Sequence, residues 1–283
     1  MTKNHRTKSF HEKIFSASSK CPVAVGRSSD NASPSALAYH REWEFQFILT
    51  GRGFYFIAGK KHAFQPNTVF AINPNQTHYY ALTPGCMMEK WRLMFLPAFL
   101  RDATLRRALA SLPHQVPLTG NESAVMVLLL HRMQDELNRQ ATHWKEIVRL
   151  NLGEFLWLLQ RAGGRTSPPP VINPLAQQIA DYIEQHFTQK LSIPALAARF
   201  GYSESYLSHV FKQHMRFGIK HYLLQRRIAE ARRQLAENPG VKMASVAESV
   251  GFENFGVFNR MFKLLVGITP AVYSRNSHLG SSI

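Results

Sequence analysis

Short polar and cationic side chains at helical spacing are the residues of this chain best suited to chemistry. They fall in two stretches near the C-terminus and are Ser205, Ser208, His209 and Lys212, then Asn254, Gly256, Asn259, Arg260 and Lys263. Residues three and four apart share one face of a helix. Short hydrogen-bonding groups read base edges in a major groove, and cations contact phosphates. We therefore expect these residues to form a DNA-binding surface.

Both stretches belong to an internal repeat with a period of about 50 residues. Each copy has an apolar stripe opposite its polar face, formed by Leu207, Val210 and Phe211 and by Phe258, Met261 and Phe262. A short helix is expected before each stretch, over residues 192–200 and 243–250, and each ends at a glycine that can take a positive φ. A single helical hairpin could simply build a bundle, but two copies with cations on matching faces favour a double helix-turn-helix.

A joining helix is expected over residues 219–237, where Arg226, Arg227, Arg232 and Arg233 lie. Such a helix can place two recognition helices in successive major grooves, about 34 Å apart. One subunit would then contact a site of nearly two turns of DNA.

Aromatic and charged residues between positions 43 and 92 form a second candidate site. They are Trp43, Glu44, His78, Tyr80, Trp91 and Arg92. Small-molecule sites commonly combine an apolar or aromatic wall with a few polar anchors. We therefore expect these residues to bind a small organic effector, such as a sugar.

The elements that would position these residues change in kind along the chain. Alternating apolar and polar residues predict antiparallel strands over 43–49, 53–57, 68–72, 78–82 and 88–96. A helical period over 121–161 predicts two helices, the first with Val125, Leu128, Leu129, Met133 and Leu137 on one face. The expected domains are a sensor and dimerisation domain at 1–162, a linker rich in glycine and proline at 163–174, and an all-α domain at 175–283.

Composition restricts the possible partners. The chain has 283 residues, with 34 Lys and Arg against 18 Asp and Glu and a formal net charge of +16, which favours a polyanion. No apolar stretch reaches the roughly 18 residues of a membrane span, and residues 1–13 lack the core of a secretory signal. Cys21 and Cys86 are too far apart in sequence to indicate a zinc finger or a disulfide framework. We expect a cytoplasmic, nucleoid-associated protein that does not enter a membrane.

The C-terminal hundred residues resemble the AraC family of bacterial transcription regulators. The residues that carry the resemblance are Val246–Ala247, Gly251–Phe252, Phe258, Arg260, Phe262–Lys263, Gly267, Thr269–Pro270 and Tyr273. The resemblance implies a domain of seven helices in which Ser205, Ser208, His209, Gly256, Asn259 and Arg260 face bases or backbone. Two features depart from the family pattern. Arg216 stands where the second copy has Gly267, which predicts a longer or irregular first recognition helix, and Phe255 with Gly256 predicts sparse base readout by the second.

Residues 40–47, Gly51, Gly53, Pro66, Asn73–Pro74 and His78 resemble the cupin-like sensor barrel that many members of this family carry. The implied fold is an α+β multidomain protein, with an antiparallel barrel and a helix pair before the double helix-turn-helix domain. A metal-dependent cupin enzyme using His40, Glu44 and His78 is a rival hypothesis. Metal-binding cupins bring a paired His-x-His, and Glu42 stands where the second histidine would be. We therefore expect no catalytic residue, no metal and no cofactor.

The resemblance also indicates partners. They are double-stranded operator or promoter DNA, RNA polymerase under an activator role, a small-molecule effector and a second copy of the chain. A constitutive regulator whose barrel only dimerises is the remaining alternative, and it predicts no effector-dependent change in melting temperature or DNA affinity.

Overall fold

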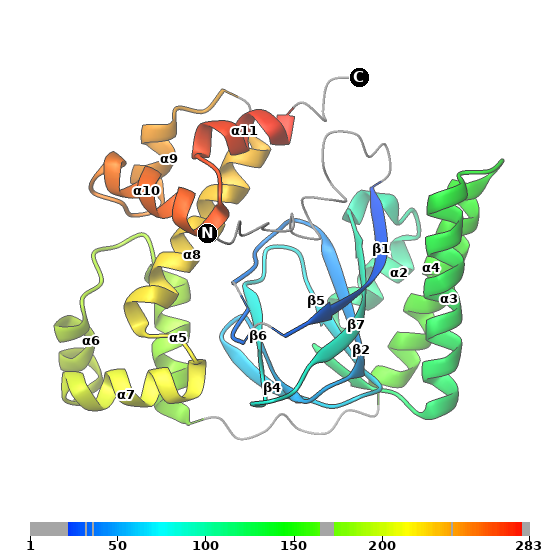
Figure 1. Ribbon diagram of the computed structural model, residues 1–283, viewed down its shortest axis with the longest axis horizontal. Coiled ribbons are helices and arrows are strands. Elements are labelled where there is room, and N and C mark those ends of the chain that lie inside the picture. The colour runs from blue at the N-terminus through cyan, green and yellow to red at the C-terminus, as the bar shows by residue number, and fades with distance from the viewer. Residues whose placement is uncertain (1–21, 32, 36, 165–172, 239, 279–283) are drawn as a thin grey trace, which may run out of the picture.

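The computed structural model describes residues 22–31, 33–35, 37–164, 173–238 and 240–278 (Figure 1). Its strands are β1 (Val23–Asp30), β2 (Trp43–Thr50), β3 (Gly53–Ile57), β4 (Lys60–Phe64), β5 (Thr68–Ile72), β6 (His78–Leu82), β7 (Met88–Phe95) and β8 (Gln115–Pro117). Its helices are a 3-10 turn η1 (Pro97–Phe99), then α2 (Ala103–Ala110), α3 (Gly120–Arg139), α4 (Trp144–Gly163), α5 (Pro174–His186), α6 (Ile193–Phe200), α7 (Glu204–Met215), α8 (Ile219–Glu237), α9 (Met243–Ser249), α10 (Phe255–Val266) and α11 (Pro270–His278).

The described strands form two antiparallel sheets, which agrees with the antiparallel cupin-like sensor domain expected from the sequence, although the sheets do not close into a barrel. A five-stranded sheet has the order β1-β7-β2-β5-β8, and a three-stranded sheet has the order β4-β3-β6. All five strands predicted from alternation are present. Strands β1, β4 and β8 were not predicted. The sequence of β4, Lys-Lys-His-Ala-Phe, lacks a clear alternation.

Alternate residues of β2, β3, β5, β6 and β7 enter different cores, so the molecule is layered. Buried residues of both sheets, including Tyr55 and Phe70, pack between the sheets. The other face of the five-stranded sheet packs on α2, α3 and α4, and the other face of the three-stranded sheet packs on α5, α7 and α8. Figure 1 shows this order, with the helix pair α3–α4 on one side of the sheets and the C-terminal helices on the other.

The helix pair α3–α4 confirms the two predicted helices but corrects the predicted face. On α3 the buried residues are Ser123, Met126, Leu129, Leu130 and Met133. Val125 and Leu128 are exposed, because the helix turns a neighbouring stripe toward the sheet. Leu150 and Trp157 on α4 are exposed as well. The pair therefore covers the sheet with one stripe and presents apolar side chains outward.

Seven helices, α5 to α11, make up the C-terminal domain within residues 173–238 and 240–278. Helix α8 has the predicted bounds, and Gly201 and Gly251 take positive φ values of 74° and 90° as the turns require. Most of the predicted linker, residues 165–172, lies outside the described residues.

Arg216 corrects the expectation of an irregular first recognition helix. It adopts the left-handed conformation, with φ of 64°, and its backbone N–H donates to the carbonyl of Lys212. Gly267 ends α10 in the same way by donating to the carbonyl of Lys263. The two recognition helices thus have twelve residues each and end with the same cap.

Among the described residues, no single helix has the length and hydropathy of a membrane span. The bent pair α10–α11 passes that test by length and composition only.

Candidate functional site

The two recognition helices, α7 and α10, are built by the same local rules. Ser203 caps α7 by accepting from the N–H of Tyr206, and Asn254 caps α10 by accepting from that of Val257. One stripe of each helix is buried, with Leu207 and Phe211 in α7 matching Phe258 and Phe262 in α10. The caps and buried stripes fix which face of each helix reaches solvent.

The predicted DNA-binding residues lie on those solvent-facing sides. Exposed members are Ser205, His209, Lys212, Asn254, Gly256, Arg260 and Lys263, and half-buried members are Ser208 and Asn259. Gly256 is small for a local reason, because a Cβ there would come within 3.1 Å of the capping oxygen of Asn254. The exposure of Lys212 and Arg260 meets the main requirement of a phosphate-contacting or base-contacting surface.

Sequence reasoning assigned no DNA contact to four exposed apolar residues on the same two units. Tyr202 and Tyr206 are stacked on each other with ring centroids 5.2 Å apart, and both are about half exposed. Phe255 and Val257 are exposed near the start of α10. Apolar side chains in a major groove can contact thymine methyl groups. Their position within three residues of the caps was available in the sequence, but their exposure was not.

The arginines of α8 are engaged within the protein instead. Arg226 pairs with Glu184, Arg227 donates to the carbonyls of Phe187 and Gln189, and Arg233 bonds Glu230. The contacts of Arg226 and Arg227 hold the joining helix to α5 and to the segment that follows α5, whereas the Arg233 pair lies within α8.

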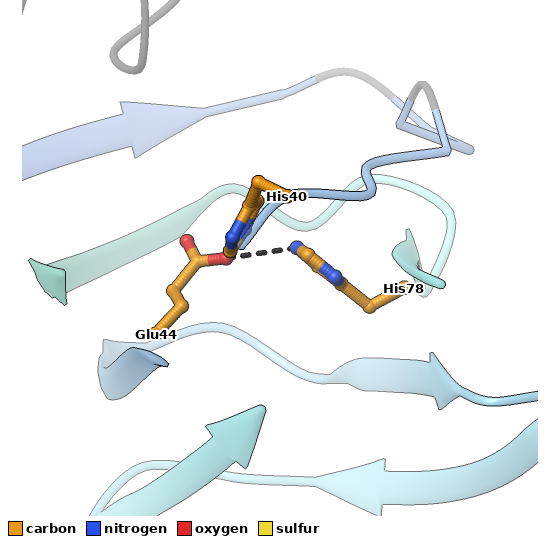
Figure 2. A group of neighbouring side chains, drawn as sticks. All are labelled: His40, Glu44 and His78. Carbon is orange, nitrogen blue, oxygen red and sulfur yellow. Dashed lines mark hydrogen bonds and ion pairs between the residues drawn. The ribbon is translucent and has the colours of Figure 1, made fainter. Parts of the chain in front are cut away.

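In the sensor domain, Glu44 on β2 is the centre of a buried polar cluster (Figure 2). Its Oε2 lies 2.9 Å from His40 Nε2 and 2.8 Å from His78 Nε2. Its Oε1 lies 2.7 Å from Gln46 Nε2 and 2.9 Å from Arg92 Nε. Burial alone would raise the pKa of Glu44, but the charges of Arg92 and His78 and the bonds from both histidines hold it well below its usual value. Glu44 is therefore a buried anion stabilised from four sides.

The cluster continues from Glu44 through the space between the sheets. Gln46 accepts a short hydrogen bond from the hydroxyl of Tyr55, which lies 3.3 Å from Lys90 Nζ. Lys90 is fully buried, pairs with Asp30 at 3.1 Å, and sits 4.2 Å from the ring centroid of Tyr80. Burial and the charge of Arg92 lower the pKa of Lys90 to about 7, although Asp30 opposes the shift.

The structure brings together four of the six predicted effector residues, namely Glu44, His78, Tyr80 and Arg92. Trp43 and Trp91 do not join them, because side chains alternate along a strand and these two point to the opposite face. There Trp43 stacks on Phe45, and Trp91 meets His131. Sequence reasoning missed Asp30, Gln46, Tyr55 and Lys90. Of these, Gln46 and Lys90 sit two residues from Glu44 and Arg92, so strand alternation could have found them.

His40, Glu44 and His78 also have the donor types of a metal site, with ligand atoms within 4.8 Å of one another. However, both oxygens of Glu44 are already engaged, and one of their four partners is the permanent cation Arg92. The positive charge of Arg92 would repel a metal cation at this carboxylate. The donor set therefore fits a hydrogen-bonded cluster better than a metal centre.

Two family models match this chain. The description "AraC-like ligand binding domain" matches residues 30–147, and "Helix-turn-helix domain" matches residues 196–276. The first span contains the Glu44 cluster, and the second contains both recognition helices. The first match ends within α4 and the second begins within α6.

Curated relatives are regulators. An uncharacterized HTH-type transcriptional regulator, YdiP of Escherichia coli, is 32% identical over 101 residues, which is 36% of this chain and 33% of that protein. A Staphylococcus aureus regulator is 35% identical over 34% of this chain and 13% of its own length. The chain thus spans a third or less of these two relatives. The arabinose operon regulatory protein of Salmonella typhimurium is 23% identical over 80% of both chains.

The solved structures that match this chain have low TM-scores. ToxT from Vibrio cholerae matches with a TM-score of 0.39 and 10% identity, over 93% of this chain and 99% of that one. The C-terminal domain of AraT, a response regulator from Geobacillus stearothermophilus, has a TM-score of 0.36 and 28% identity over 37% of this chain and 86% of its own. With a sensor domain of the AraC type joined to a helix-turn-helix domain, this chain belongs to the AraC family of transcriptional regulators.

Proposed function

We propose that this protein binds operator or promoter DNA through α7 and α10 and that a small organic effector in the sensor domain controls this binding. The observation that carries the first part is the pair of matching exposed faces, each with a cation one turn from short polar side chains. The exposed residues Lys212, Arg260 and Lys263 supply charge for phosphates. Asn259 and His209 supply hydrogen-bonding groups for base edges.

DNA selected from a randomised pool by the wild-type protein provides the test. Arg260→Ala and His209→Ala should each weaken binding to the selected sequence by about 1–3 kcal/mol, if both side chains read bases. Arg161→Ala, which removes an exposed arginine from the sensor helix α4, is the matched control and should leave affinity unchanged. Unchanged affinity in both recognition-helix variants would remove these positions from the interface.

The dependence on salt separates phosphate contacts from base contacts. Each phosphate contact releases counterions, so the logarithm of the binding constant should fall linearly with the logarithm of the salt concentration. Lys212→Ala and Lys263→Ala should make that slope shallower by about one unit each while weakening all sequences alike.

The Glu44 cluster supports the effector half of the proposal. It offers donors, acceptors and an aromatic ring from Tyr80 inside a domain of the ligand-binding type, which suits a polar molecule such as a sugar. One relative bears a name that refers to the arabinose operon. A thermal-shift screen of sugars should find a ligand that raises the melting temperature of the wild type but not of Glu44→Gln. No shift with any compound would favour the constitutive alternative.

The regulator would act as an activator in the cytoplasm, in contact with RNA polymerase, and would not be an enzyme. In vitro transcription from a promoter bearing the selected DNA tests the activator role, because an activator increases transcript yield. Stoichiometric iron, manganese or zinc in the purified protein would instead support the metal-dependent enzyme.

A homodimer is the proposed assembly, formed through the outer face of the helix pair. Val125, Leu128 and Trp157 are exposed there by 41%, 58% and 43%. Apolar patches of this kind often mark protein interfaces. Leu128→Glu should therefore yield monomers in sedimentation, while Met87→Glu, at an exposed apolar site in a loop outside this pair, should not.

A further inference from the structure

Two short segments of the sensor lie between the Glu44 cluster and the DNA-binding domain. They are residues 37–40 and residues 77–79, and they are joined by an antiparallel bridge between Ala38 and His78. The N–H of each of these two residues donates to the carbonyl of the other, at 2.7 and 3.0 Å. The bridge joins the two segments, so that they form one unit.

One side of this unit faces Glu44. His40 and His78 come from the two different segments, yet both reach the same oxygen of Glu44. Figure 2 shows the two rings converging on the carboxylate. The position of each segment therefore depends on an interaction with a single carboxylate oxygen.

The other side of the unit holds the DNA-binding domain. The Tyr79 hydroxyl donates to the carbonyl of Met215 at 2.6 Å, and the Thr77 hydroxyl donates to Glu184 at 2.8 Å. The N–H of Leu37 donates to Gln225 at 2.6 Å, and the ring of Tyr39 lies 4.7 Å from the Arg226 guanidinium. Every one of these contacts is made by a direct sequence neighbour of His40 or His78, except that of Leu37.

The helices of the DNA-binding domain that contact these segments are bonded to one another and can transmit a displacement. Glu184 on α5 also accepts from Tyr222 and Arg226 on α8, so Thr77 is tied to both helices at once. Tyr79 and Phe56 of the sensor share a continuous apolar core with α5, α7 and α8. Close-packed interiors transmit displacements instead of absorbing them.

We propose that residues 37–40 and 77–79 couple the Glu44 cluster to the DNA-binding domain, so that loss of the contacts between Glu44 and the two histidines loosens the docking of α5 and α8. This inference rests on the proposed function, since it supplies the route by which an effector competing for Glu44 would act. A ligand shifts an equilibrium only through differential affinity for two states, and the two states here are the docked and the loosened domain.

Hydrogen–deuterium exchange on the full chain tests the coupling without a known effector. Glu44→Gln keeps the shape of the side chain but removes its charge. It should lower the protection of amides in α5 and in the first turns of α8 by about threefold or more, and leave α10 and α11 unchanged. Glu146→Gln, which breaks an exposed ion pair with Arg149 on α4, is the control and should change neither region. Loss of protection confined to the sensor strands would overturn the proposal.

A double-mutant cycle examines the route itself. Tyr79→Phe removes only the hydroxyl that bonds Met215, and should lower protection in α5 and also around Glu44 in β2, because coupling is reciprocal. Combined with Glu44→Gln, its effect on α5 should be smaller than the product of the two single effects. Effects that multiply independently would overturn the proposal, and so would a Tyr79→Phe variant with unchanged β2. The DNA-binding test with Arg260→Ala is independent of either result, so a failure here is distinguishable from a failure of the proposed function.

Discussion

The two helix-turn-helix units share one sequence pattern but have different neighbours. In the first unit, Leu207, Phe211 and Met215 pack in a core that includes Phe56 and Tyr79 of the sensor. In the second unit, Phe258 and Phe262 pack with α8, α9 and α11 in a core that contains no sensor residue among those that the structure describes. Their caps are alike, and so are their lengths. The difference teaches that a repeat can keep its local fold while only one copy becomes part of a domain interface.

Core truncations should give the largest contrast between the units. Phe211→Ala and Phe262→Ala each remove a fully buried ring and should each cost about 3–5 kcal/mol of local stability. Only Phe211→Ala should also expose β6, because its core is shared with the sensor. Hydrogen exchange of residues 78–82 in both variants makes the measurement. Equal exposure of β6 in both variants would show that the cores are not separate.

Acid should destabilise the sensor and the first unit before the second. Burial, with the charges of His114 and Lys60, lowers the pKa of His62 to about 4, and burial also lowers the pKa of His214 and His221. A histidine whose folded pKa lies below its unfolded value of about 6.5 stabilises the fold above that pH, and this contribution is lost as the pH falls from about 6.5 to about 4.

The expected loss from His62 alone is on the order of 3 kcal/mol, because its pKa is about 6.5 in the unfolded chain and about 4 in the fold. Residues 240–276 contain no histidine, so the second unit should keep its protection across this range. Circular dichroism and hydrogen exchange between pH 7 and pH 4 would follow both parts. His62→Gln should reduce the acid sensitivity, and a variant that remains as acid-sensitive as the wild type would contradict the assignment.

The smallest contrast concerns the residues that end the recognition helices. Arg216 and Gly267 both have left-handed φ, of 64° and 92°, a conformation that costs a non-glycine residue about 1–2 kcal/mol. Gly267→Ala should lower stability by about 1 kcal/mol, and Arg216→Gly should raise it by up to about 1 kcal/mol, less the chain entropy that glycine adds. Urea denaturation measures both. A destabilised Arg216→Gly would mean that the arginine side chain stabilises the first unit by more than its backbone strain.

Local pattern predicted the elements well where one rule governed a whole segment. The alternation in residues 43–49 predicted β2. The repeat predicted both recognition helices with most of their buried faces, and it also predicted α8 as the helix that joins its two copies. Arg216 shows the limit of such rules. A backbone hydrogen bond from its N–H to the carbonyl of Lys212 ends the helix at this residue, in a conformation that its type disfavours.

The candidate site was less predictable because it depends on register between distant strands. One face of β2 and β7 turns toward the other sheet, and on this face Glu44 and Arg92 meet. Trp43 and Trp91 lie on the opposite face and enter another core. Asp30 and Tyr55 carry no local signal for their contacts with Lys90. The bond from Leu37 to Gln225 spans 188 residues of sequence, so no pattern within either segment could indicate it.

Helix α8 connects the sensor contact to the second helix-turn-helix unit and can act as a lever between them. Its 19 residues span about 28 Å, with the first turns fixed beside the sensor and the last turns embedded in the second unit. A tilt of about 10° at the sensor end would move the far end by about 5 Å, which exceeds the base-pair rise of about 3.4 Å. A tilt of that size would be enough to carry α10 from one base step to the next.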